Sequence, residues 1–87
     1  MTKNSLESLP NIGKNLAEKL NQSGIDSLQS FEKLKTEEIF LALKSEYPDA
    51  CLNTLYAIEG AKQNIRWHQI DKPRKKDLLA FFNEIGS

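Results

Sequence analysis

The sequence predicts an all-α fold, a compact bundle of five to six short helices. Apolar residues recur at helical spacing throughout the chain, and helix-cap signatures precede several of these segments. No segment alternates apolar and polar residues as a half-buried strand does, and valine is absent. A chain of 87 residues is expected to form one domain, spanning residues 1–87.

The first two predicted helices lie on either side of a proline. Residues 4–7 read Asn-Ser-Leu-Glu, a capping pattern that predicts a short helix over about 5–9. Pro10 ends this helix, because the residue before a proline avoids the helical region. A second helix is expected over about 14–22, with Gly24 placed for a left-handed C-cap. The apolar residues on one side of this unit are Leu9, Ile12, Leu16 and Leu20.

Four further helices are predicted in the rest of the chain. A second cap signature opens a helix over about 27–34, and Thr36 is expected to cap the next one, which ends before Pro48. A longer helix follows over about 50–64, and the last covers about 72–85. The apolar residues expected to face the core are Leu28, Phe31, Leu34, Ile39, Phe40, Leu43, Tyr47, Leu52, Leu55, Tyr56, Ile58, Leu78, Leu79, Phe82 and Ile85.

The overall charge gives no strong indication of a partner. A formal net charge of zero argues against a general electrostatic attraction to nucleic acid. Counting Lys and Arg against Asp and Glu, residues 1–59 carry a net −3 and residues 60–87 a net +3. This excess is small, and a solvated helix start explains it as well as a binding surface does.

Cysteine usage and hydropathy indicate the compartment. No apolar stretch is long enough to span a bilayer, and the N-terminus lacks the pattern of a secretion signal. Cys51 is the only cysteine, so no internal disulfide is expected and the cytoplasm is the expected location. Beside Leu52, Cys51 is expected to be a small buried residue, with a reactive thiol at a helix start as the alternative.

The sequence offers no constellation for catalysis. His68 is the only histidine, and no second His or Cys stands near it to complete a zinc site. The carboxylates form no isolated pair of the kind that acid–base catalysis uses, and no phosphate-binding glycine loop is present. We therefore expect a non-enzymatic protein without metal, cofactor or small-molecule substrate.

The turn at residues 10–13 is the main candidate for a binding site. Asn11 and Gly13 tolerate positive φ angles, so the chain can reverse sharply between the two helices. The amides from Gly13 to Asn15 then lie at a helix start without intrahelical acceptors, where anions bind. Lys14 adds a positive charge beside them. A nucleic-acid phosphate would satisfy these donors without any reading of bases.

Basic residues elsewhere extend the predicted footprint if they fold onto the same face. Lys19 lies on the second helix, and most of the positive excess follows Trp67. The predicted nucleic-acid-binding residues are Asn11, Gly13, Lys14, Asn15, Lys19, Arg66, Arg74, Lys75 and Lys76.

Two other residues admit structural or functional interpretations. Trp67 between two helices is expected in the core or at its rim, with base stacking as the alternative. Glu59 lies within a helix that is expected to be buried, and a salt bridge with Arg66 or Lys62 would compensate its burial.

Two stretches carry a resemblance to known families. LPNIGKNLAEKLNQSGIDSLQSFEKL resembles a helix-hairpin-helix motif, with the unit at about residues 5–24, and this resemblance implies a grip on the nucleic-acid backbone without sequence preference. Asn11 stands where that motif has its first hairpin glycine, so its side chain could crowd a phosphate. LPNIGKNLAEKLNQSGIDS, LNTLYAIEGAKQNIRWHQI and KKDLLAFF are together similar to the C-terminal domain of the TfoX/Sxy competence regulators of bacteria. This second resemblance implies an all-helical domain linked to regulation of DNA uptake and transformation.

Two functions therefore stand as hypotheses. The first is a regulatory module that binds the DNA backbone through the 10–13 turn. The second is an adaptor that binds a regulatory protein on the same scaffold without touching nucleic acid. Its surface would be an exposed apolar patch at Phe81 or Phe82, since both cannot point inward unless the last helix is covered on two sides.

Overall fold

The computed structural model describes residues 5–86, and all regular structure among them is helical. The elements in chain order are η1 (Ser5–Ser8), α1 (Lys14–Gln22), α2 (Leu28–Lys33), α3 (Thr36–Glu46), α4 (Leu52–Gln63), η2 (Trp67–Gln69) and α5 (Lys72–Gly86). The predicted all-α fold is confirmed. The first predicted helix is a 3₁₀ turn, and a second 3₁₀ turn occupies the segment around Trp67, which was expected to be a loop.

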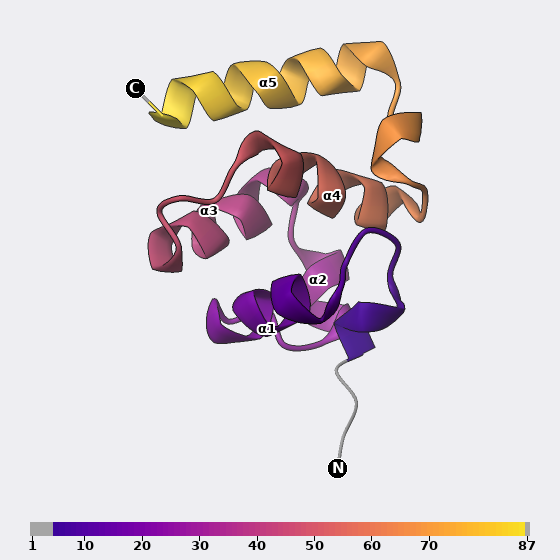
Figure 1. Ribbon diagram of the computed structural model, residues 1–87, viewed down its shortest axis with the longest axis vertical. Coiled ribbons are helices and arrows are strands. Elements are labelled where there is room, and N and C mark those ends of the chain that lie inside the picture. Colours follow the sequence, from indigo (N-terminus) through magenta and orange to yellow (C-terminus); the bar gives the residue numbers. More distant parts are fainter. Residues whose placement is uncertain (1–4, 87) are drawn as a thin grey trace.

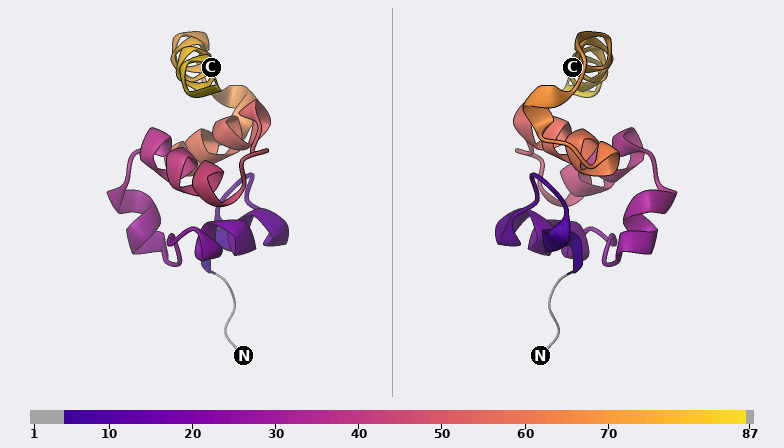
Figure 2. Two further views of the ribbon diagram at one scale, coloured as in Figure 1. Left: turned by 90° about the vertical axis from the view of Figure 1, so that its left-hand side faces the viewer. Right: turned by 90° about the vertical axis from the view of Figure 1, so that its right-hand side faces the viewer.

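The helices lie at three levels along the long axis of the molecule (Figure 1). η1, α1 and α2 form one end, α3 and α4 pack side by side in the middle, and α5 crosses at the other end (Figure 2). The turn after η1 rises from the first level toward the loop between α4 and η2 (Figure 1). This rise brings segments far apart in sequence together at one side of the molecule.

Every α-helix contributes to one apolar core. The buried side chains include Leu6, Ile12, Ala17, Leu20, Ile25, Phe31, Ile39, Phe40, Leu43, Leu55, Ile58, Ala61 and Leu78. Within α1, α3 and α4 these residues recur at three- or four-residue intervals, so each of these helices buries one stripe, whereas α2 and α5 contribute one fully buried residue each. Among the described residues, no helix has the length and apolarity that crossing a membrane requires.

The predicted end of α1 and start of α2 are confirmed. Gly24 has a φ angle of 97°, and the amides of Gly24 and Ile25 donate to the carbonyl groups of Asn21 and Leu20 at 3.1 and 2.9 Å. This pair of bonds is a Schellman motif. At α2, the hydroxyl of Ser27 accepts from the amide of Ser30 at 3.0 Å.

Thr36 does not cap α3, contrary to the sequence prediction. The N-cap is Lys35, whose amide donates to Oε1 of Glu38 at 2.8 Å. Thr36 is instead the first helical residue and is buried, and its hydroxyl donates to Oε1 of Glu59 at 2.7 Å. A hydroxyl that could have capped its own helix therefore satisfies a buried carboxylate on α4.

Glu59 joins three helices through its carboxylate. Besides Thr36 of α3, it accepts from Gln63 of α4 and from Nη2 of Arg74 on α5 at 3.0 Å. Nη1 of Arg74 also donates to Glu37 at 3.1 Å. The expected pairing of Glu59 with Arg66 or Lys62 is therefore wrong. The charge of this buried group is compensated from α5.

Lys62 binds the C-terminal end of α2 instead of Glu59. Its ammonium donates to the carbonyl oxygens of Phe31 and Leu34 at 2.9 and 2.6 Å, and to that of Glu32 at 3.3 Å. A cation at this position satisfies the last carbonyl groups of a helix and complements its dipole. Lys62 thereby ties α4 to α2.

The apolar surface of α5 differs from the prediction. Leu78 is fully buried, but Leu79 is 40% exposed, although it was expected to face the core. Phe81 and Phe82 are both partly buried and pack against the core, and Phe82 lies 6.0 Å from Phe40 between ring centroids. Neither is among the large apolar residues that the described part of the chain exposes, so the apolar patch of the adaptor hypothesis is not found at Phe81 or Phe82.

The Glu59 network predicts a specific loss of stability in acid. Burial opposes ionisation of Glu59, but hydrogen bonds from Arg74, Thr36 and Gln63 outweigh it, so the pKa of this carboxyl lies below its ordinary value of 4.5. The folded state therefore binds fewer protons, and the stabilisation is complete above pH 4.5 and lost as the pH falls through the folded pKa. We expect Glu59→Gln to lower the free energy of unfolding by about 1–3 kcal/mol at neutral pH, as measured by urea denaturation.

The same substitution should flatten the decline of stability with acid below pH 4.5. Glu18→Gln, on the exposed side of α1, is the control and should change stability by less than about 0.5 kcal/mol. An acid profile of Glu59→Gln that matches the unchanged protein would contradict the assignment.

Candidate nucleic-acid interface

The 10–13 turn is held by one residue with a positive φ angle. Asn11 has φ 68°, in the left-handed region that asparagine tolerates. Gly13 does not use the freedom expected of it, because its φ is −90° and it serves as N-cap of α1. The reversal of the chain therefore depends on Asn11.

The side chain of Asn11 binds the distant α4–η2 loop. Its Nδ2 donates to the carbonyl oxygen of Ile65 at 2.9 Å, and its Oδ1 accepts from the amide of Trp67 at 3.1 Å. One carboxamide thus pairs with a donor and an acceptor on the same segment, as an adjacent strand would. We call this pair of bonds the Asn11 clasp. The crowding of a phosphate expected from this side chain does not follow, because the carboxamide is engaged within the protein.

Gly60 makes room for the Asn11 clasp. A Cβ atom at this position would lie 2.5 Å from Nδ2 of Asn11 and 2.9 Å from the carbonyl oxygen of Ile65. It would also lie 3.1 Å from Cα of Trp67. The glycine in mid-helix, which costs about 1 kcal/mol in helix propensity, is therefore explained by the approach of the turn and the loop to α4.

The start of α1 faces solvent, and its first amide donors have no acceptor among residues 5–86. Gly13, Lys14 and Asn15 are exposed, and the first amide of the helix with an acceptor is that of Ala17, which donates to Gly13 at 2.9 Å. No side chain among residues 5–86 caps this end. The positive end of the helix dipole and the neighbouring ammonium of Lys14 therefore meet at an open surface.

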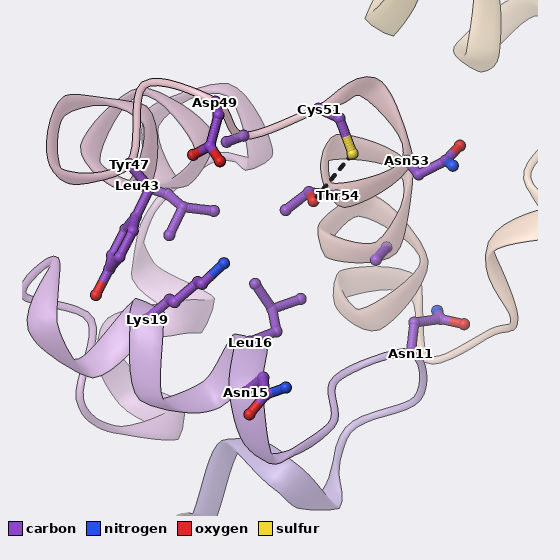
Figure 3. Close-up of a pocket in the computed structure, with 12 residues that line it drawn as sticks. Asn11, Asn15, Leu16, Lys19, Leu43, Tyr47, Asp49, Cys51, Asn53 and Thr54 are labelled. Carbon is purple, nitrogen blue, oxygen red and sulfur yellow. Dashed lines mark hydrogen bonds between the residues drawn. The ribbon is translucent and has the colours of Figure 1, made fainter.

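Two adjoining cavities lie beside the turn. The first, of about 380 Å³, is bounded by α1 on one side and by the start of α4 on the other (Figure 3). Asn15 and Lys19 line it from α1, and Figure 3 shows Asp49 on the opposite wall. The second, of about 420 Å³, is lined by Asn11, Asn53, Ala57, Arg66, Trp67 and His68. Asn11 of the turn and Asn53 and Ala57 of α4 border both cavities.

An aromatic group borders the second cavity. The rings of Tyr56 and Trp67 are nearly parallel, with an angle of 7° and a centroid separation of 6.2 Å. The ammonium of Lys75 lies 5.3 Å from the Trp67 ring centroid and 5.8 Å from that of Tyr56. Trp67 is 43% exposed, so it lies outside the core and presents much of its indole to solvent.

The basic residues predicted from sequence are divided among several environments. Lys14, Asn15 and Lys19 lie along α1, and Arg66 is exposed beside the turn. Lys75 covers the aromatic group, whereas Lys76 is exposed on α5. Arg74 lies apart from them, with its guanidinium bound to Glu37 and Glu59.

Among the described residues, Arg74 is the one predicted contact that forms ion pairs. Within residues 5–86, the remaining cations of the set have no carboxylate oxygen at ion-pair distance. Three of these cations, Lys14, Lys19 and Arg66, lie beside the turn, although the net charge of the chain is zero.

Cys51 is exposed, and the expectation that it is buried is wrong. It is the N-cap of α4, with its Sγ 3.6 Å from Oγ1 of Thr54. The hydrogen bond from the Thr54 side chain, with amide donors at the helix start, holds the pKa of the thiol below its ordinary value of 9.0. Within residues 5–86, no group of three or more His, Cys, Asp or Glu side chains is placed to hold a metal ion.

The sequence model of the TfoX C-terminal domain family matches residues 2–82 of this chain. The chain belongs to this family. A crystal structure of an uncharacterized protein from Listeria monocytogenes, in a triclinic form, is 36% identical with a TM-score of 0.92 and covers 94% of this chain and 93% of its own. A tetragonal form, described as a protein of unknown function from the same organism, is 37% identical with a TM-score of 0.87, over 90% and 96%. No curated protein matches the chain.

The close approach of Asn11 and Ile65 to Gly60 predicts whether Gly60→Ala raises or lowers the free energy of unfolding of this TfoX C-terminal domain. Helix propensity alone predicts that Gly60→Ala stabilises the protein by about 1 kcal/mol. Because the new Cβ would collide with Asn11 and the Ile65 carbonyl, we expect destabilisation by about 1–3 kcal/mol instead, measured by urea denaturation. Gly13→Ser is the control, because its Cβ meets nothing within 4 Å. If Gly60→Ala instead raises the free energy of unfolding, the Asn11 clasp can shift to accommodate a Cβ atom, and the prediction is wrong.

The environment of Cys51 predicts a measurable shift in its titration. We expect Thr54→Val to raise the pKa of the thiol toward 9.0, because the hydroxyl partner of the thiolate is lost. The pH profile of thiolate ultraviolet absorbance, after subtraction of the profile of Cys51→Ser to remove the tyrosines, reports this residue alone, since it is the only cysteine. Ser45→Ala on α3 should leave the profile unchanged. An unshifted profile in Thr54→Val would rule out the hydroxyl as the cause.

Proposed function

We propose that this TfoX C-terminal domain is a non-enzymatic cytoplasmic regulatory module, acting in the control of DNA uptake and transformation, that binds the nucleic-acid backbone. The observation that carries the proposal is the open start of α1, where the amides of Gly13, Lys14 and Asn15 have no acceptor within the described residues. A phosphate oxygen provides the acceptor and the negative charge that this helix end favours. Such contacts carry no sequence information, so binding would be non-specific.

The Asn11 clasp extends this contact surface beyond α1. It joins the turn to the segment that carries Arg66, so the two stand at one side of the molecule. Lys14 and Lys19 lie on α1, and Lys75 lies over Trp67. The proposed contacts are therefore Gly13, Lys14, Asn15, Lys19, Arg66 and Lys75. Arg74 is left out because its charge is already neutralised by Glu37 and Glu59.

An adaptor function without nucleic acid is the second candidate, and one observation favours it. Leu41 on α3 and Leu79 on α5 are 46% and 40% exposed, and with Trp67 they are the large apolar residues that the described part of the chain exposes. They replace Phe81 and Phe82 as candidate contacts to a regulatory protein. Membership of the family is compatible with both functions.

Charge reversal at Lys14 tests backbone binding. We expect Lys14→Glu to weaken binding of a labelled duplex and of one of its separated strands, because it removes a cation and repels phosphate. The slope of log affinity against log salt should fall by about one unit or more. Fluorescence anisotropy between about 50 and about 200 mM salt measures both quantities.

Lys33→Glu is the matched control for this experiment. Lys33 is exposed in the last turn of α2, and this change alters net charge equally without touching the 10–13 turn. Equal losses in the two variants would assign binding to net charge rather than to the turn. If neither duplex nor single strand binds at low salt, the adaptor function replaces the proposal. Circular dichroism confirms that both variants keep their helicity.

A further inference from the structure

Trp67 is unusual in its exposure and its surroundings. It is the only tryptophan, and 43% of it is exposed, although an indole buried in the core would contribute more stability. Its backbone is fixed, because the Asn11 clasp holds its amide and η2 begins at this residue. The indole lies beside the rings of Tyr56 and, at right angles to it, His68, and the rest of it is presented to solvent.

One side of the indole is already occupied. Lys75 lies near the centroids of both Trp67 and Tyr56, and these two rings are nearly parallel. The cavity of about 420 Å³ has Trp67 in its wall but neither Tyr56 nor Lys75. Trp67 therefore borders two different environments, a cation–aromatic cluster and an open cavity of the size that small ligands occupy.

The rest of the cavity wall has the chemistry that recognises a nucleotide. Asn53 is exposed, and its carboxamide offers both donors and an acceptor for a base edge. Arg66 forms no ion pair among the described residues, so its guanidinium is available to a phosphate. Asn11 also lines this cavity, and two residues further along the chain the open start of α1 begins.

We propose that the cavity beside Trp67 binds an unpaired nucleobase of a single-stranded nucleic acid, stacked on the indole. The proposal rests on the backbone binding proposed above and adds the form of the partner. Flanking phosphates of the same strand lie on Arg66 and on the start of α1. Bases within a duplex are stacked on one another and do not present their faces, so Trp67 selects single strands.

The test compares strands that carry the same phosphates but differ in their bases. We expect a thymidine strand of about ten nucleotides to bind about tenfold more tightly than an abasic strand of equal length, because stacking contributes at the level of one base. The thymidine strand should quench the fluorescence of Trp67, which is unambiguous because the chain has one tryptophan. The abasic strand should leave it nearly unchanged.

Substitution of the indole completes the experiment. Trp67→Leu should reduce affinity for the thymidine strand to that for the abasic strand and leave abasic binding unaltered. Leu41→Ala, which changes another large exposed apolar residue, is the control and should keep the preference. A Trp67→Leu protein that fails to fold does not remove the test, because fluorescence of the unchanged protein reports the contact directly.

The outcomes separate the two proposals. Equal affinity for thymidine and abasic strands with unquenched Trp67 would overturn base stacking, while loss of that binding in Lys14→Glu would leave the backbone contact standing. Tighter binding of a duplex than of the thymidine strand would also overturn it. Absence of binding to every strand and duplex at low salt would remove both proposals together.

Discussion

The arrangement of the candidate interface depends on one carboxamide. Asn11 lies 54 and 56 positions before the residues that its side chain binds, and these hydrogen bonds fix the turn before α1 against the loop after α4. Asn11 and Ile65 lie outside regular structure, and Trp67 is the first residue of η2. Buried or half-buried backbone groups require partners, and here the asparagine supplies a donor and an acceptor at once. With the buried contacts of Ile12, it sets the position of the open end of α1 relative to the indole.

The clasp also accounts for two residues that are otherwise unfavourable. A positive φ angle at a non-glycine residue is strained, and glycine within a helix lowers helix propensity. Asn11 and Gly60 carry these costs at facing positions, where Nδ2 of the one occupies the space that a Cβ of the other would need. The two residues form one contact and are best understood as a pair.

Local signals in the sequence were sufficient for most helix ends. Ser27, Gly24 and Pro48 act within a few residues of themselves, so their roles follow from the chain alone. Partners in tertiary structure were not predictable in this way. Thr36 has a side chain typical of a helix cap, but its hydroxyl donates to Glu59 on another helix. Arg74 was expected at the interface, but its guanidinium binds that same carboxylate.

Only one part of the candidate interface, the start of α1, was predictable from the sequence. The exposed amides at the start of α1 follow from the proline, the turn and the helical stripe after it. The exposure of Trp67 was expected only as the alternative to a place in the core or at its rim, because a lone aromatic residue between helices carries no signal of direction.

The run at residues 74–76 shows how a helix divides a charged segment. Successive residues of an α-helix are rotated by about 100°, so three consecutive cations span more than half of its circumference. Here one binds carboxylates between helices, the next lies over aromatic rings, and the third faces water. Three cations that are adjacent in the sequence therefore lie in three different environments, and only the second of them, Lys75, contacts the indole.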